Sequence, residues 1–99
     1  MDHRDLNSLE LSVETSAVAM ARAAGWWASP KLQFAGQRGA PDRMFIKAGR
    51  VVFIEFKRPS GGKKAVAQKR LAREMTQAGA EVFFCNTIGD VVLALEMGA

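Results

Sequence analysis

The sequence predicts a small α/β domain, with a mixed central sheet flanked by helices in the order α-β-β-β-α-β-α. First, two apolar runs flank residues 47–50, Lys-Ala-Gly-Arg, which is typical of a β-hairpin. Second, the run 51–56 is apolar except for one glutamate, which is typical of a central strand. Third, a helical stretch separates that run from the strand-like segment 81–85. This spacing favours a parallel pair joined by a right-handed crossover.

The other elements follow from periodicity and from residues that end helices. Apolar residues recur at helical spacing from about Leu11 to Ala24, with glycine next. Segment 26–34 is expected to be a strand that Pro30 places at an edge or interrupts. A second helix is expected over about 65–78 and a short third over about 89–97.

Length and composition indicate one domain with a real core. The chain has 99 residues, of which 48% are hydrophobic. We expect residues 1–8 to be a flexible N-terminus and residues 9–99 to form the domain. No apolar run approaches the roughly 20 residues of a membrane span, and the start lacks a signal-peptide pattern. The single cysteine, Cys85, lies in an apolar run and is interpreted as a buried structural thiol. One cysteine forms no internal disulfide and fits a reducing compartment, so we expect a cytoplasmic protein.

The charge balance favours an anionic partner without identifying it. Fourteen Lys and Arg against ten Asp and Glu give a net charge of +4, which fits nucleic acid. The densest basic region includes Lys63 and Lys64; it is either a solvated face or a surface for a phosphate backbone. Arg38 and Arg43 can contact phosphates or be ordinary surface charges. A nucleotide-binding loop is missing from the sequence, so we expect no nucleotide cofactor.

The hairpin places two carboxylates together. If Ala48 and Gly49 form the turn, counting outward puts Asp42 opposite Glu55 on one face of the sheet. Like charges in that position normally destabilise a sheet unless a cation lies between them. Lys57 shares the face of Glu55, so the alternative interpretation is a solvated ion pair at the strand end.

These residues suit metal-assisted hydrolysis of a phosphodiester. Asp42 and Glu55 can share Mg²⁺ or Mn²⁺, with the backbone carbonyl of Phe56 as a further ligand. Such an ion lowers the pKa of water and polarises a phosphoryl oxygen. Lys57 can then orient or deprotonate the nucleophile and offset negative charge on the phosphate.

The spacing also resembles a known family. Pro41-Asp42 followed by Glu55-Phe56-Lys57 is similar to the active-site signature of the PD-(D/E)XK nucleases. Further features fall in order over nearly the whole chain, and the ensemble resembles the VRR-NUC domain, the virus-type replication-repair nuclease. They are Glu14, Gly25-Trp26, the loop 36–42, the strand 52–59, Gln68 and the segment 78–80. The resemblance implies a restriction-endonuclease-like fold and a Mg²⁺- or Mn²⁺-dependent endonuclease.

The resemblance also implies roles for single residues. It makes Asp42 and Glu55 metal ligands and Lys57 the catalytic lysine. It makes Gln68 an active-site residue that positions water or phosphate; otherwise Gln68 is a packing residue. It makes Glu14 a contributor to the metal site, directly or through water, whereas its spacing alone indicates a surface acid favoured by the helix dipole.

The resemblance further implies a substrate and an assembly. Stand-alone VRR-NUC proteins of this size are often phage-encoded, are similar to Holliday-junction resolvases and are thought to cut branched DNA as homodimers. We therefore expect a homodimer in the host cytoplasm if the chain is phage-encoded, with its interface near Trp26-Trp27. The alternatives are a flap-directed, nick-directed or non-specific nuclease, a non-catalytic DNA-binding module, and a structural domain whose acids pair with basic residues.

Overall fold

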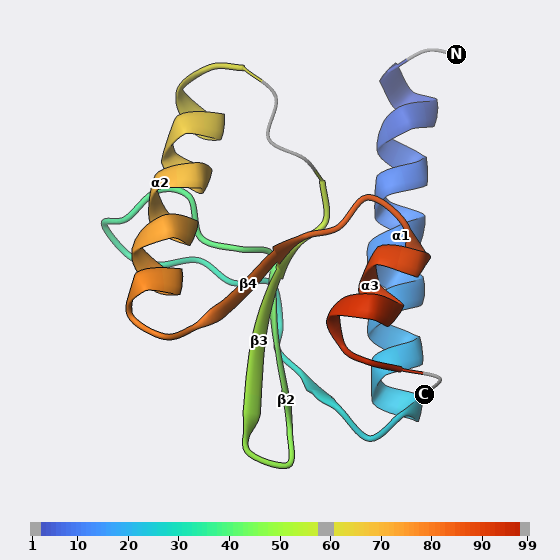
Figure 1. Cartoon of the computed structure of the whole chain (residues 1–99). Helices are drawn as coiled ribbons and strands as arrows, with labels where there is room; N and C mark the ends of the chain where they lie inside the picture. Colours follow the sequence, from blue (N-terminus) through green and yellow to red (C-terminus); the bar gives the residue numbers. More distant parts are fainter. Residues whose placement is uncertain (1–2, 58–60, 98–99) are drawn as a thin grey trace.

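The computed structural model describes residues 3–57 and 61–97. It confirms the α/β class, the order of the elements and the mixed sheet (Figure 1). The elements are α1 (His3–Ala23), β1 (Trp27–Ala28), β2 (Arg43–Lys47), β3 (Arg50–Glu55), α2 (Lys63–Gln77), β4 (Glu81–Phe84) and α3 (Ile88–Ala94). The strands are hydrogen-bonded in the order β1-β2-β3-β4, so β3 is internal, as its apolar sequence predicts.

The predicted hairpin and its register are confirmed. Lys47 pairs with Arg50 and Arg43 with Ile54 in the antiparallel β2–β3 ladder. Ala48 and Gly49 form the turn, and both have positive φ (51° and 84°). Positive φ at both central residues characterises the type I′ turn, whose twist matches that of the two strands. The β3–β4 pair is parallel, as the crossover helix predicts.

Helices cover both faces of the sheet. Figure 1 shows α1 and α3 together on one side and α2 on the other. Phe45, Val52 and Ile54 are fully buried, and they belong to a core cluster that also contains residues of α1 and α3. Neighbours along β3 point to the α2 face, where Val51 is 39% exposed and Glu55 is 3% exposed. The prediction that both faces of β3 are buried is therefore wrong for Val51 and correct at the Glu55 end.

The strand predicted over 26–34 is far shorter than expected. Only Trp27–Ala28 form regular ladder pairs with β2. Beyond them Ser29 N donates to Met44 O at 2.8 Å and Leu32 N donates to Asp42 O at 2.9 Å, so the chain still follows β2 without forming a continuous ladder. Pro30 has no N–H to donate, which explains the interruption. This irregular segment brings residue 31 beside Asp42.

The helix boundaries also differ from those predicted. α1 begins at His3 rather than at Leu11, so it takes in most of the segment expected to be flexible; residues 1–2 lie outside the described part. α2 begins at Lys63, two positions before the predicted start, and α3 ends at Ala94 rather than at 97. In the described part of the chain, the helices are all too short or too polar to cross a bilayer.

The turn residue Ala48 offers a test of the hairpin. Ala48→Asn should stabilise the domain by about 0.5–1 kcal/mol, because asparagine adopts the left-handed conformation at lower cost than alanine. Urea unfolding of the two proteins measures the difference. In the control Ala19→Asn, at an exposed position within α1, the same change should lower stability. An unchanged or reduced stability of Ala48→Asn would contradict the left-handed turn.

Candidate active site

The two predicted carboxylates meet on the α2 face of the sheet. Asp42 lies directly before β2 and Glu55 ends β3, so the hairpin register places them across from each other. Their carboxyl groups are hydrogen-bonded to each other. The backbone N–H of Phe56 donates to Asp42 Oδ2 at 2.9 Å, which fixes the Asp42 side chain and keeps the Phe56 backbone at the site.

Gln68 joins this pair from α2. Its side chain is buried, and Nε2 donates to Glu55 Oε2 at 3.1 Å. The helix is held close by the loop before β2, because a Cβ atom at Gly39 would collide with the backbone carbonyl of Ala67. Gly39 also has a φ of +92°, which favours glycine. The close contact between loop and helix therefore fixes the distance from Gln68 to the acid pair.

One proton is retained between the two acids. Burial, followed by the hydrogen bond to Asp42 and the negative charge of Asp42, raises the pKa of Glu55 to about 8. Burial also opposes ionisation of Asp42, but hydrogen bonds from Glu55, the Phe56 N–H and Lys31 outweigh it and hold the pKa of Asp42 below its usual value. At neutral pH, Glu55 is therefore largely protonated and donates to an ionised Asp42.

Two lysines lie near Glu55, from different elements. Lys57, two residues beyond Glu55, and Lys64, in the first turn of α2, both exert a positive charge that opposes the rise in the Glu55 pKa. Lys57 is partly buried, whereas Lys64 is exposed. The positive charge of the predicted catalytic lysine thus acts on the acid pair, and its part in catalysis stays a prediction.

Glu14 reaches the site through other residues. It is 7% exposed, so the interpretation as a solvated surface acid is wrong. Arg43 Nε donates to it at 2.9 Å and Lys31 Nζ at 3.3 Å, and Lys31 Nζ also lies 3.1 Å from Asp42 Oδ1. Within residues 3–57 and 61–97, no three acidic, histidine or cysteine side chains form one metal-binding group. A contribution of Glu14 to a metal site, directly or through water, stays a prediction.

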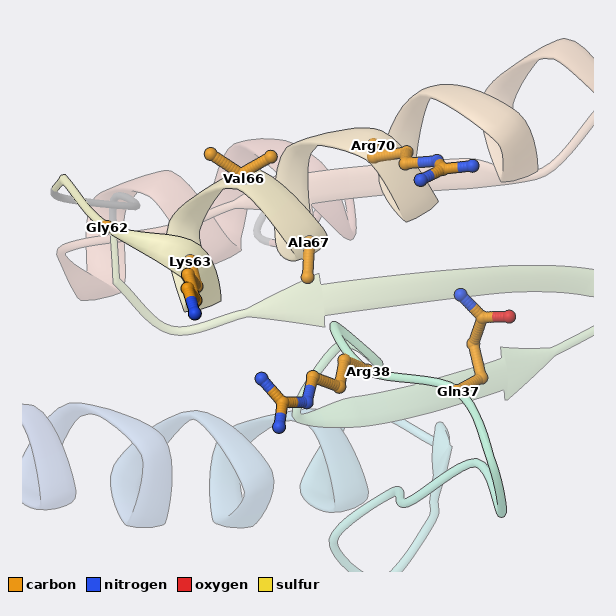
Figure 2. Close-up of a pocket in the computed structure, with 7 residues that line it drawn as sticks. All are labelled: Gln37, Arg38, Gly62, Lys63, Val66, Ala67 and Arg70. Carbon is orange, nitrogen blue, oxygen red and sulfur yellow. The ribbon is translucent and has the colours of Figure 1, made fainter.

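Three of the four predicted DNA-binding residues line hollows beside the acids. Arg38 and Lys63 line a hollow of about 530 Å³ between the loop and α2 (Figure 2). Arg38 and Lys64 line a second one of about 910 Å³. The structure does not bring Arg43 to either, because its guanidinium donates to Glu14 and, at 2.9 Å, to the Ser29 carbonyl.

Lys31 is the site residue that sequence reasoning missed. Its ammonium group links Glu14 to Asp42, although the side chain is 59% exposed. The sequence offers one indirect signal: an ionised acid in a partly buried pair needs a cation, and Pro30 predicts irregular backbone at this point. Which lysine or arginine fills that role depends on how the chain runs after Pro30, and the sequence pattern does not encode this.

The donor set fits a hard divalent cation. The available ligands are the carboxylate oxygens of Asp42 and Glu55 and the Phe56 carbonyl, and oxygen is the donor that Mg²⁺ and Mn²⁺ prefer. The pair also holds a proton where two ionised carboxylates would repel. A divalent ion can replace that proton and satisfy both charges.

The protonated Glu55 predicts an unusual dependence of stability on pH. Because its pKa is raised in the folded state, the folded chain binds more protons than the unfolded chain between the ordinary value of 4.5 and about 8. Stability should therefore fall as pH rises through this window. Glu55→Gln should remove this component, so that the variant becomes more stable than the parent near pH 8 but not near pH 4.5.

Thermal unfolding in a chelator from about pH 4.5 to about pH 9 measures this difference, since contributions from other groups cancel between the two proteins. Glu74→Gln, on an exposed part of α2, is the matched control and should keep the parent profile. Parallel profiles for Glu55→Gln and the parent would contradict a proton shared with Asp42.

One comparison with known proteins, the search of solved structures, supports the fold. No family model and no curated protein matches the chain. Among solved structures, a chain described as "VRR_NUC domain" superposes with a TM-score of 0.76 at 27% sequence identity. The match covers 92% of this chain and 98% of the other. This match, over nearly the whole of both chains, supports the assignment of the protein as a VRR-NUC domain.

Proposed function

We propose that this VRR-NUC domain is a Mg²⁺- or Mn²⁺-dependent endonuclease that hydrolyses phosphodiester bonds in DNA. The domain type implies nuclease activity in general. The observation that carries the specific proposal is the buried acid pair sharing one proton, with Gln68 bonded to it and Lys57 beside it. A structural ion pair would not need to bring two carboxyl groups into contact.

Each residue then has a distinct task. Asp42, Glu55 and the Phe56 carbonyl would hold the divalent ion, which supplies positive charge at the scissile phosphate and lowers the pKa of water. Lys57 orients the attacking water and offsets charge on the phosphate. Gln68 holds Glu55 through Nε2, which leaves its amide oxygen to accept a hydrogen bond from water.

Residues around this centre keep it in place. Lys31 neutralises Asp42 while the divalent ion is absent, and its contact with Glu14 ties the site to α1. Arg43 fixes Glu14 from the other side. This ring of charges gives Glu14 a supporting part in holding the acids in position.

We further propose a branched DNA substrate such as a four-way junction. Phosphate contacts position a protein without reading bases, and the basic side chains gather beside the acids rather than on a separate reading element. The alternative is a flap-directed, nick-directed or non-specific nuclease. A non-catalytic DNA-binding module is disfavoured, because it would not need two acids and a lysine at one site.

A homodimer fits this substrate, because paired cuts need two sites related by symmetry. Trp26 is buried in the core cluster, so only Trp27 of the predicted interface pair is available, at 53% exposed. The register places Trp27, Ile46 and Val51 side by side on the face that carries Glu55. We propose that this apolar strip contacts the second copy. We also propose that the protein acts in the cytoplasm, which is that of the host if the chain is phage-encoded.

Cleavage of labelled DNA tests the proposal. The purified protein should cut a four-way junction in Mn²⁺ or Mg²⁺ in preference to a linear duplex. Asp42→Asn and Glu55→Gln should lower the rate by about a thousandfold or more, and Lys57→Ala by about a hundredfold or more, because each removes part of the charge stabilisation. Asp42→Asn should still bind junction DNA, since repulsion of phosphate falls.

Glu74→Gln is the control and should keep the parent rate. Light scattering on the same samples gives the oligomeric state, and a monomer at working concentration would contradict the dimer. Parent-like cleavage by Asp42→Asn or Glu55→Gln would remove the acid pair from the mechanism. Equal rates on junction, flap, nicked and linear DNA would favour the non-specific alternative.

Metal binding can be measured without cleavage. Mn²⁺ at about 100 times its dissociation constant should stabilise the fold by about 2.7 kcal/mol. The gain should be larger near pH 8 than near pH 6, because the ion competes with the proton on Glu55, whose pKa is raised to about 8. Differential scanning fluorimetry with Asp42→Asn as control measures this shift. No metal response at either pH would favour the purely structural domain.

A further inference from the structure

A groove with an apolar floor lies between the loop before β2 and one side of α2. Gln37 and Arg38 form one wall, and Lys63, Val66 and Arg70 line the helix side (Figure 2). Its volume is about 530 Å³, within the roughly 300–1,000 Å³ of small-molecule sites. The contact of Gly39 with the Ala67 backbone holds the two walls together.

The floor of this groove has no evident role in folding. Val66 is 64% exposed and, with Ala67, lines the helix side of the groove. It lies on a different side of α2 from the buried residues Ala65, Gln68 and Leu71. Valine is also a weaker helix former than the polar residues usual on an exposed face. An apolar patch at this position is therefore available for a ligand.

The rim of the groove is cationic. Arg38 and Lys63 are exposed and make no ion pair within residues 3–57 and 61–97, while Arg70 pairs with Glu74 in the next turn at 3.5 Å. The ligand that suits this rim carries negative charge next to an apolar surface. Gln37 adds an amide that can both donate and accept a hydrogen bond.

A second hollow connects the groove to Lys31, which contacts the acid pair. The adjoining hollow of about 910 Å³ shares Gln37, Arg38 and Ala67 with it and extends to Lys64 and Lys31. Lys31 in turn contacts Asp42 at 3.1 Å. A polynucleotide whose scissile phosphate lies at the acids can therefore run past Lys64 and Arg38 into the groove.

We propose that this groove binds one unpaired nucleotide of the DNA substrate, a proposal that rests on the nuclease function above. The base lies on Val66 and Ala67 with its polar edge toward Gln37, and Arg38 and Lys63 contact the flanking phosphates. The phosphates of a duplex can bind the cationic rim of the groove. A duplex presents no apolar face to the floor, however, because its bases are stacked on one another. An unpaired base presents both a flat apolar face and a polar edge. Among branched substrates, the groove thus favours DNA in which one nucleotide next to the cut is unpaired or leaves the base stack.

The test compares two ligands on cleavage-deficient protein. Asp42→Asn binds a duplex carrying one unpaired nucleotide and a fully paired duplex of the same length, without metal, and anisotropy gives the two dissociation constants. The unpaired nucleotide should tighten binding, and adding Val66→Ser should reduce that preference about three- to tenfold, because the apolar contact is lost. Adding Arg38→Ala should instead weaken binding to both ligands, most strongly at low salt.

The matched control is Leu93→Ser in the same background, which changes an apolar residue 79% exposed on α3 and should keep the full preference. A Val66→Ser protein with a parent-like melting temperature and an undiminished preference would overturn the groove assignment, even if the parent cleaves DNA normally. Equal affinity of the starting protein for both ligands would overturn it too. Because the assay needs no cleavage, a Val66-dependent preference would support the groove even if the parent proves inactive.

Discussion

The structure depends on one costly contact, the pairing of the Asp42 and Glu55 carboxyl groups across the β2–β3 hairpin. Two ionised acids in contact at a buried position would repel strongly, so burial and the neighbouring Asp42 raise the pKa of Glu55 to about 8 and the pair keeps a proton. Several neighbours then serve to hold that arrangement: the Phe56 N–H and Lys31 bond Asp42, and Gln68 bonds Glu55. A cation can remove the repulsion between the two carboxylates. The acid pair is therefore a prepared binding site rather than a feature that stabilises the fold.

The hairpin turn has an unusual importance for this contact. A shift of one residue in the β2–β3 register would turn Asp42 to the opposite face of the sheet, into the core formed with α1 and α3. The type I′ geometry at Ala48 and Gly49 specifies the register locally. The buried side chains of Phe45 and Val52, which pair on the core face, specify it a second time. The geometry of the acid pair is therefore fixed by core packing some distance from the acids.

Sequence reasoning succeeded where the signal was local and periodic. The alternation along β3 and the turn at 48–49 were enough to predict that Asp42 and Glu55 face each other. It failed where tertiary contacts decide. Pro30 signalled an interruption, but only the hydrogen bonds of Ser29 and Leu32 to β2 bring Lys31 to Asp42. For Arg43 the sequence allows a phosphate contact or an ordinary surface charge, because charge alone cannot tell a residue that faces solvent from one that faces a buried acid such as Glu14.

The α2 face of the sheet carries two different kinds of surface. At the Glu55 end, α2 covers the sheet and encloses the acids, and the basic hollows lie on its other sides. At the hairpin end, which extends past α2 in Figure 1, Trp27 and Val51 remain exposed. The position of α2 thus leaves room for association at the hairpin end while the helix covers the acids at the other. In this arrangement a partner bound at the hairpin end need not obstruct DNA at the acids, because β3 itself separates the two regions by the length of the strand.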